Sequence, residues 1–182
     1  MPRDTDVAIV EAVLRGDPDA FGSLVDKYQR PIFNLALRIT GNREDAMDAT
    51  QDAFIKAYQN LGRFDPSRRF FSWFYRIAVH EALDLVRPRL VAEELPAEVA
   101  APGPLPDARA ESRERAASIQ QALLRLSLSH RVVIVLRHFL DLSYDEMGEI
   151  LELPQKTVKS RLFAARQQLR GVLVELGLGG LR

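Results

Sequence analysis

Cysteine is absent from the 182-residue chain, which excludes disulfides and thiolate metal sites. The three histidines, His80, His130 and His138, lack the spacing typical of metal ligands. There is also no Gly-rich phosphate-binding loop, no motif of paired metal-binding carboxylates and no Ser/His/Asp arrangement. We therefore expect no metal, no cofactor, no small-molecule substrate and no catalytic residue.

Long hydrophobic runs are missing as well. The longest aliphatic run, residues 132–136, is far shorter than the roughly 20 apolar residues that a membrane-spanning helix needs. The acidic N-terminal stretch has no hydrophobic segment typical of a signal peptide. These absences predict a cytoplasmic protein without direct membrane insertion.

The chain has no excess of either charge, with 25 basic and 25 acidic residues. A net charge of zero argues at first against a nucleic-acid partner, because binding to phosphates needs basic surface. The distribution of charge is uneven, however, since residues 156–170 contain five basic residues and no acidic one. Such a local basic stripe is typical of a surface that binds a polyanion.

Helical periodicity fills most of the sequence, and no stretch shows the sustained alternation of a half-buried strand, so we expect an all-α protein. A helix is predicted to begin after Asp17-Pro18, with Asp17 as its N-cap. Pro31 and the Thr-Gly-Asn run at 40–42 are expected to punctuate the next segment. Pro88 is expected to end a helix that begins near Phe70.

Residues 91–107 contain four prolines together with alanines and acids, and they have too little apolar material to build a core. We therefore predict two small helical domains, residues 1–90 and 118–182, joined by a flexible linker at 91–117. Each core would be modest at this size, so partner binding would add stability.

The second domain has the pattern of a helix-turn-helix. Ser143 and Glu146 match a capping box at the start of a short helix. Pro154 follows that helix, and a second helix is predicted over residues 155–170. At 100° per residue, Val158, Leu162, Ala165 and Leu169 fall on one side of the second helix. The opposite side collects mainly cationic and polar side chains: Lys156, Lys159, Ser160, Phe163, Gln167 and Arg170.

This exposed basic side suits recognition of a DNA major groove, because long cationic side chains reach phosphates and guanine edges. A solvated surface helix would show the same amphipathic pattern. The capped partner helix and the tight turn favour DNA binding over that simpler interpretation.

The motifs LSYDEM at 142–147, LP at 153–154, TVKSRL at 157–162 and AR at 165–166 closely resemble region four of extracytoplasmic function (ECF) sigma factors, within the sigma-70 family. Two departures from the family pattern are Glu152, where a turn glycine is usual, and Ala164, where a basic residue is common. The resemblance implies that the second helix recognises the promoter's minus thirty-five element. The residues it assigns to this contact are Lys156, Thr157, Lys159, Ser160, Arg161, Phe163 and Arg166.

The N-terminal domain resembles region two of the same family. The motif AMDATQDAF at 46–54 is similar to the polymerase-binding segment, which implies that Asp48, Gln51, Asp52 and Lys56 contact RNA polymerase. Solvated helix surface is the alternative interpretation of these four residues.

The motif SWFYRIA at 72–78, followed by ALD at 82–84, resembles the helix that reads and melts the minus ten element. Capture of an unstacked strand needs aromatic faces or pockets for bases and cations for phosphates. For Trp73 we expect a place in the core, as is usual for aromatic clusters at helical spacing. His80 departs from the family, where asparagine is common. The residues assigned to the minus ten element are Phe64, Arg68, Arg69, Arg76, His80, Asp84 and Arg87.

The resemblance implies an ECF-type sigma factor whose partners are core RNA polymerase, promoter DNA and an anti-sigma factor. One alternative is a free-standing helix-turn-helix regulator, although residues 1–90 show no dimerisation heptads. A second alternative is a sigma mimic that sequesters an anti-sigma factor without binding DNA, which the basic residues Lys156, Lys159 and Arg161 argue against.

Overall fold

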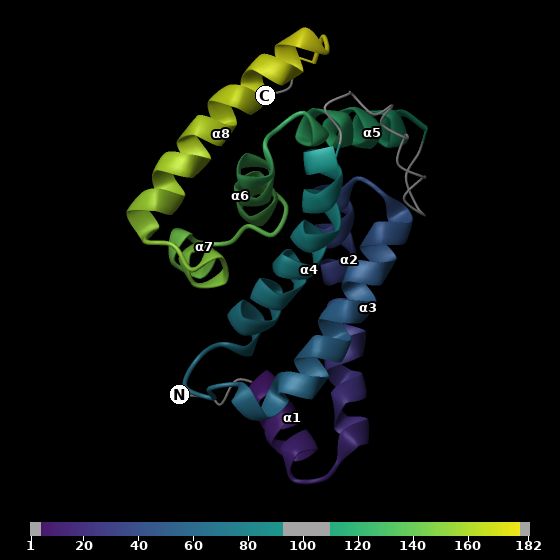
Figure 1. Cartoon of the computed structure of the whole chain (residues 1–182), viewed down its shortest axis with the longest axis vertical. Coiled ribbons are helices and arrows are strands. Elements are labelled where there is room, and N and C mark those ends of the chain that lie inside the picture. The colour runs from purple at the N-terminus through teal and green to yellow at the C-terminus, as the bar shows by residue number, and fades with distance from the viewer. Residues whose placement is uncertain (1–4, 93–109, 179–182) are drawn as a thin grey trace.

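The computed structural model describes residues 5–92 and 110–178 (Figure 1). These residues form eight α-helices and two short 3-10 helices, with no strand among them, which confirms the all-α prediction. No helix within these two ranges has both the length and the apolar character needed to span a membrane. The elements are α1 (Thr5–Leu14), η1 (Pro18–Ala20), α2 (Phe21–Thr40), α3 (Arg43–Asn60), η2 (Leu61–Arg63), α4 (Phe70–Ala92), α5 (Ala110–Leu124), α6 (Leu128–His138), α7 (Tyr144–Leu151) and α8 (Gln155–Glu175).

Helices α1 to α4 form an N-terminal module in which α2, α3 and α4 pack side by side and α1 crosses one end (Figure 1). Helix α3 buries mainly alanines toward its neighbours, and their small side chains allow a close approach of the helix backbones. Bulky aromatic side chains from α2 and α4, such as Tyr28, Phe70 and Phe74, fill the remaining space. The mixture of small and large residues gives the module a packed core.

Local signals predict several helix boundaries correctly. The Asp17 side chain accepts a hydrogen bond from the Ala20 backbone N–H, as expected of an N-cap at this turn. Gly41 ends α2 in the left-handed conformation at φ +74°, and the Asn42 side chain caps α3. These positions provide partners for backbone groups that have none within the helices.

Two prolines were expected to interrupt helices, and both expectations are wrong. Helix α2 continues through Pro31, and α4 runs past Pro88 to Ala92. A proline inside a helix costs about 3 kcal/mol, since one hydrogen bond is lost. In α2, burial of apolar residues on both sides of Pro31, including Tyr28 and Ile32, offsets that cost.

Helices α5 to α8 form a C-terminal module, in which α6 lies between α8 and the N-terminal module (Figure 1). All residues from Val132 to Leu136 are buried, because α6 packs against α2, α7 and α8. An apolar run of this kind belongs to a helix segment covered on several sides. This placement explains the aliphatic run that stands out in the sequence.

The region between the modules differs in part from the prediction. Helix α5 begins at Ala110, inside the range 91–117 that was expected to be a flexible linker. Residues 93–109 of that range lie outside the described residues. The sequence reasoning also assigned no helix to residues 5–14, where the structure has α1.

The two modules pack against each other, which the sequence did not predict. The buried guanidinium of Arg131 on α6 donates hydrogen bonds to the carbonyl of Ile39 on α2 and to that of Leu123 on α5, the latter at 3.0 Å. Gln120 Nε2 on α5 donates to the Leu37 carbonyl at 3.2 Å. The last carbonyls of a helix have no partner within it, and the negative end of the helix dipole attracts a cation. Arg131 therefore joins the ends of two helices from different modules.

Candidate nucleic-acid interface

The capping box of α7 forms as the sequence predicts. Ser143 Oγ accepts a hydrogen bond from the Glu146 N–H at 3.2 Å, and Glu146 Oε2 accepts one from the Ser143 N–H at 2.9 Å. These bonds to Ser143 are the main cause that lowers the pKa of Glu146, with a smaller contribution from Arg69. The box fixes the start of the first helix of the helix-turn-helix.

The turn between α7 and α8 depends on two backbone features. Glu152 adopts the left-handed conformation at φ +53°, which favours glycine or asparagine. A Cβ atom at Gly148 would lie 2.9 Å from the Leu153 carbonyl oxygen, so this position requires glycine. The sequence reasoning missed Gly148, whose requirement shows only in the contact between helix and turn.

Helix α8 has the two faces that the 100° periodicity predicts. Val158, Leu162 and Ala165 are buried against the rest of the C-terminal module. Lys156, Lys159, Ser160, Phe163, Gln167 and Arg170 are all exposed. Phe163 exposes 66% of its surface, which is unusual for an aromatic residue in the middle of a helix.

The residues predicted for the minus thirty-five contact differ in their burial and in their contacts. Thr157 and Arg161 are half-buried. Arg166 Nε donates a hydrogen bond to His138 Nε2 at 3.2 Å, and the His138 pKa is lowered by burial and by the nearby Arg166 and Arg137 cations. Lys159 Nζ lies 5.3 Å from the centre of the Tyr144 ring, which places its charge at the junction of α7 and α8.

The cationic residues predicted for the minus ten element lie along α4 and the loop before it, and two of them contact α7 or its C-cap residue Glu152. Arg69 Nη1 lies 2.8 Å from Glu146 Oε1, and Arg76 Nη1 lies 2.5 Å from Glu152 Oε1. Arg68 pairs with Asp65 at 3.8 Å, and Arg87 pairs with Asp84 at 3.1 Å. The face of α4 that would meet a DNA strand is therefore partly covered by the C-terminal module.

The aromatic residues near this face lie mostly in the core. Phe64 is 7% exposed and packs against Phe70 and Trp73, with ring centres 5.5 and 5.4 Å apart. Trp73 is half-buried and packs against the core, as expected. Contact between Phe64 and a base would require that this ring be uncovered.

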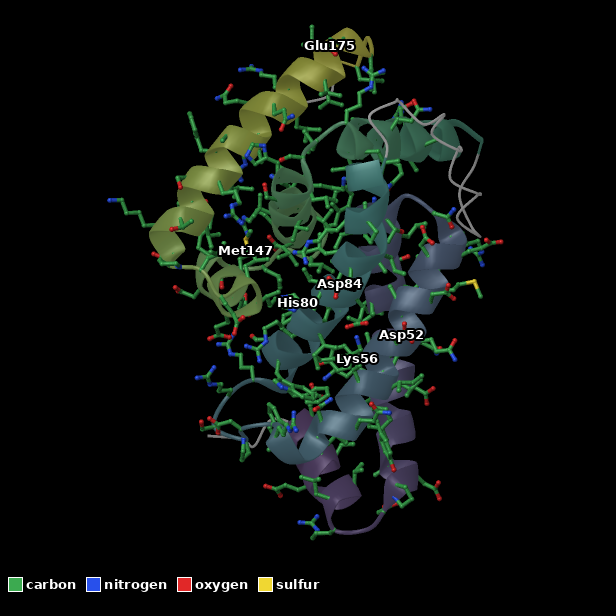
Figure 2. All side chains as sticks on the ribbon, in the orientation of Figure 1. Asp52, Lys56, His80, Asp84, Met147 and Glu175 are labelled. Atoms are coloured by element: carbon green, nitrogen blue, oxygen red, sulfur yellow. The ribbon has the colours of Figure 1, made fainter. Side chains whose placement is uncertain are left out.

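His80 is exposed on α4, on the side toward the C-terminal module (Figure 2). Together with Arg87 from α4 and Arg161 from α8, it lines a cavity of about 320 Å³ between the modules. The cavity brings one residue predicted for the minus thirty-five contact close to two predicted for the minus ten contact.

The residues predicted to bind polymerase share one exposed surface of α3. Asp48, Gln51 and Asp52 are exposed. Lys56 Nζ binds Glu81 Oε2 of α4 at 2.6 Å. Figure 2 labels Asp52 and Lys56 on α3. This hydrogen bond is the main cause that raises the pKa of Lys56. The sequence reasoning missed the large apolar side chains on the outside of α3: Met47, Ile55 and Tyr58, which are 54%, 44% and 45% exposed.

Comparison with known protein families places both modules in one family. The family model for Sigma-70 region 2 matches residues 24–89, and the model for Sigma-70 region 4 matches residues 116–169. The chain belongs to the sigma-70 family, a class of transcription initiation factors.

Individual relatives narrow the assignment to the ECF group. The ECF RNA polymerase sigma factor SigW of Bacillus subtilis is 40% identical, over 92% of this chain and 96% of SigW. The RNA polymerase sigma-H factor of Pseudomonas aeruginosa is 36% identical, over 97% of each chain. The protein is therefore an ECF-type sigma factor.

Solved structures agree with the fold. CnrH, solved in complex with the cytosolic domain of CnrY, is 28% identical with a TM-score of 0.75, over 94% of this chain and 99% of CnrH. The sigma factor RpoE of Bartonella quintana, solved in complex with the anti-sigma factor NepR, is 22% identical with a TM-score of 0.70 and shares the fold, over 84% of this chain and 96% of RpoE.

Proposed function

We propose that this ECF sigma factor recruits core RNA polymerase to promoters by contacting DNA at two sites. The observation that carries the proposal is the exposed cationic face of α8, which stands on a capped helix and a tight turn. Helix α8 would read the minus thirty-five duplex in a major groove, while α4 and the loop before it would hold the opened minus ten strand. The division into residues 1–90, a linker at 91–117 and residues 118–182 is part of this proposal.

The residues that would carry each contact are those that the resemblance to sigma-70 regions two and four assigns. On α8 they are Lys156, Thr157, Lys159, Ser160, Arg161, Phe163 and Arg166. Near α4 they are Phe64, Arg68, Arg69, Arg76, His80, Asp84 and Arg87. Phosphate contacts by the cations would supply much of the affinity, while base contacts would select the promoter.

The outer surface of α3 would bind polymerase through Asp48, Gln51, Asp52 and Lys56. The exposed Met47 and Ile55 support an interface there, because large apolar side chains on a helix surface gain free energy when a partner covers them. Control by an anti-sigma factor is also part of the proposal. The structures of CnrH and RpoE, each solved with a protein partner, support it.

Run-off transcription from a pool of promoter fragments tests the proposal. Core polymerase is assayed with and without the protein, then with Lys159→Ala and with Arg125→Ala, which removes a cation from the same module outside the DNA-binding face. We expect specific transcripts that Lys159→Ala weakens and Arg125→Ala does not.

If the wild-type protein binds DNA but does not bind core polymerase, the proposal is wrong and a free-standing regulator is favoured. Sequencing of the transcribed fragments would define the promoter.

A further inference from the structure

The contact between α4 and α7 is built from complementary charge. Residues 141–152 contain five acidic residues and no basic one, directly before the basic stripe at 156–170. Three of these carboxylates, on Glu146, Glu149 and Glu152, point at the N-terminal module. The charge of the helix-turn-helix is thus divided between an acidic first helix and a basic second helix.

The three carboxylates meet three polar residues of the other module in register. Glu146 binds Arg69 at 2.8 Å, Glu149 Oε2 accepts a hydrogen bond from Ser72 Oγ at 2.6 Å, and Glu152 binds Arg76 at 2.5 Å. Residues spaced by three or four along a helix share one face. Arg69 directly precedes α4 and Glu152 is the C-cap of α7, so each helix together with the residue at its end presents a row of side chains to the other. The first row includes two of the cations assigned to the minus ten strand.

Glu152 links this contact to backbone strain. Its φ of +53° lies in the left-handed region, where a side chain other than glycine or asparagine is disfavoured. A glycine would satisfy the turn at lower cost. The strained residue nevertheless provides the carboxylate that binds Arg76, and strain retained at one position points to a role for the side chain.

We propose that α7 is a built-in competitor of the minus ten strand. In the free protein its carboxylates occupy Arg69, Ser72 and Arg76, and α7 must leave this face before single-stranded DNA binds there. The inference rests on the proposed function, because that function assigns Arg69 and Arg76 to the promoter strand. Each arginine donates to a carboxylate through Nη1, and that negative charge repels a phosphate brought to the same guanidinium, so the two partners compete.

The contact is suited to reversible opening. Each ion pair has one exposed partner, Arg69 at 64% and Glu152 at 61%, opposite a partner that is mostly covered, Glu146 at 25% and Arg76 at 29%. Ion pairs that reach solvent in this way are weakened by salt. A second contact holds the modules elsewhere, where the Arg38 guanidinium lies 3.7 Å from the centre of the Phe139 ring and Arg131 binds α2. The contact between α4 and α7 can therefore be removed without removing this second contact.

The test variant is Glu149→Ala combined with Glu152→Gly. It removes two of the three carboxylates, keeps Glu146 in its capping box and relieves the strain at position 152. The matched control is Asp145→Asn combined with Glu175→Gln. It removes the same charge from the same module, at residues that bind Gln155 and Arg125 rather than α4.

Two measurements are made on the full chain. The first is the rate at which phenylglyoxal modifies Arg69 and Arg76, followed by mass spectrometry with the exposed Arg63 as internal reference. The second is binding of a fluorescent pool of short random-sequence single-stranded DNA, followed by anisotropy at low salt. For the test variant relative to the control, we expect faster modification and about two- to fivefold tighter binding, as removal of weak ion pairs would give.

The possible failures are distinct. Unchanged modification of Arg69 and Arg76 would show that α7 does not cover them in solution and would overturn the inference, while run-off transcription would still decide the proposed function. Faster modification of Arg69 and Arg76 without tighter binding of single-stranded DNA would also overturn the inference. In that case the arginines would be uncovered but would not bind the strand, so the premise that this face of α4 is the strand site would be wrong. An equal increase in modification rate and in strand binding in the control variant would overturn the inference, because the lower negative charge of the protein would then explain both effects.

Discussion

At the scale of single residues, polar side chains complete the backbone hydrogen bonding at helix ends. Asn42, Ser127 and Ser143 each accept a hydrogen bond from the first turn of the helix that follows them. Gly41 contributes through its conformation, because it ends α2 with a positive φ. Single substitutions at such positions have effects that can be derived from local geometry.

The capping carboxylate of Glu146 predicts a pH-dependent stability. Its pKa in the folded protein is below the ordinary value of 4.5, so the ionised form stabilises the fold. Glu146→Gln should therefore be less stable than the wild type at neutral pH. The difference should shrink below pH 4.5, as the wild-type carboxylate becomes protonated. Urea unfolding of both proteins across this pH range measures the free energy of unfolding. A difference in that free energy that does not change with pH would contradict the explanation.

Gly41 predicts a penalty for any side chain. Its φ is +74°, and a Cβ atom would lie 2.6 Å from Leu124 Cδ2 on α5. We expect Gly41→Ala to lower the free energy of unfolding by about 1–2 kcal/mol, measured by chemical denaturation. Gly171→Ala is the matched control, since it lies inside α8 with no atom near the added Cβ, and it should stabilise by about 0.5–1 kcal/mol. Similar effects of the two substitutions would contradict the explanation.

At the scale of elements, α8 separates a packing face from a face available to a partner. Its buried residues are predictable from periodicity, because the helix lies against one side of its own module. Periodicity also predicts the exposed cations. It did not predict that α2 and α4 continue through Pro31 and Pro88, because packing along the whole helix decides whether a proline is tolerated.

The exposed face of α8 predicts a salt-dependent contribution to duplex binding. If Lys156 contacts a phosphate, Lys156→Ala should weaken binding to all sequences alike. It should also reduce the slope of log K against log salt by about one. Arg15→Ala, which removes an exposed cation directly after α1, should leave that slope unchanged. Titration of a promoter duplex at several salt concentrations measures the affinity and the slope for each variant. An unchanged slope for Lys156→Ala would exclude a phosphate contact.

At the scale of the whole molecule, Arg131 couples the two modules. Burial lowers its pKa to about 10, so it remains protonated at neutral pH and donates to four backbone carbonyls: those of Ile39, Leu123, Leu124 and Leu126. Removal of the guanidinium would remove all four hydrogen bonds, although the Leu123 carbonyl would still accept one from the Leu126 N–H at 3.1 Å. Unsatisfied buried acceptors are costly, so this residue contributes to the stability of both modules.

We therefore expect Arg131→Met to lower stability by about 3 kcal/mol and to uncouple the modules. The only tryptophan, Trp73, reports on the N-terminal module, whereas far-UV circular dichroism reports on all helices. In the wild type the two unfolding curves should coincide, and in the variant they should separate. Arg125→Met, an exposed arginine of the same module, should leave them coincident. Coincident curves in Arg131→Met would show that other contacts couple the modules.

The sequence by itself determined the all-α class, the capped helix-turn-helix and the sigma-70 relationship. Helix periodicity, the Ser143 capping box and the two faces of α8 arise between residues within a few positions of each other, so they leave a pattern that can be read along the chain.

Only the tertiary structure decided which of the predicted cations face solvent. The partners Arg69 and Glu146 are 77 positions apart in the sequence, and the partners Arg131 and Ile39 are 92 positions apart. Contacts over such separations depend on how the modules pack, and they leave no local periodicity. For that reason the sequence predicted two independent modules, while the structure has a closed molecule in which α7 covers part of the proposed strand-binding face of α4.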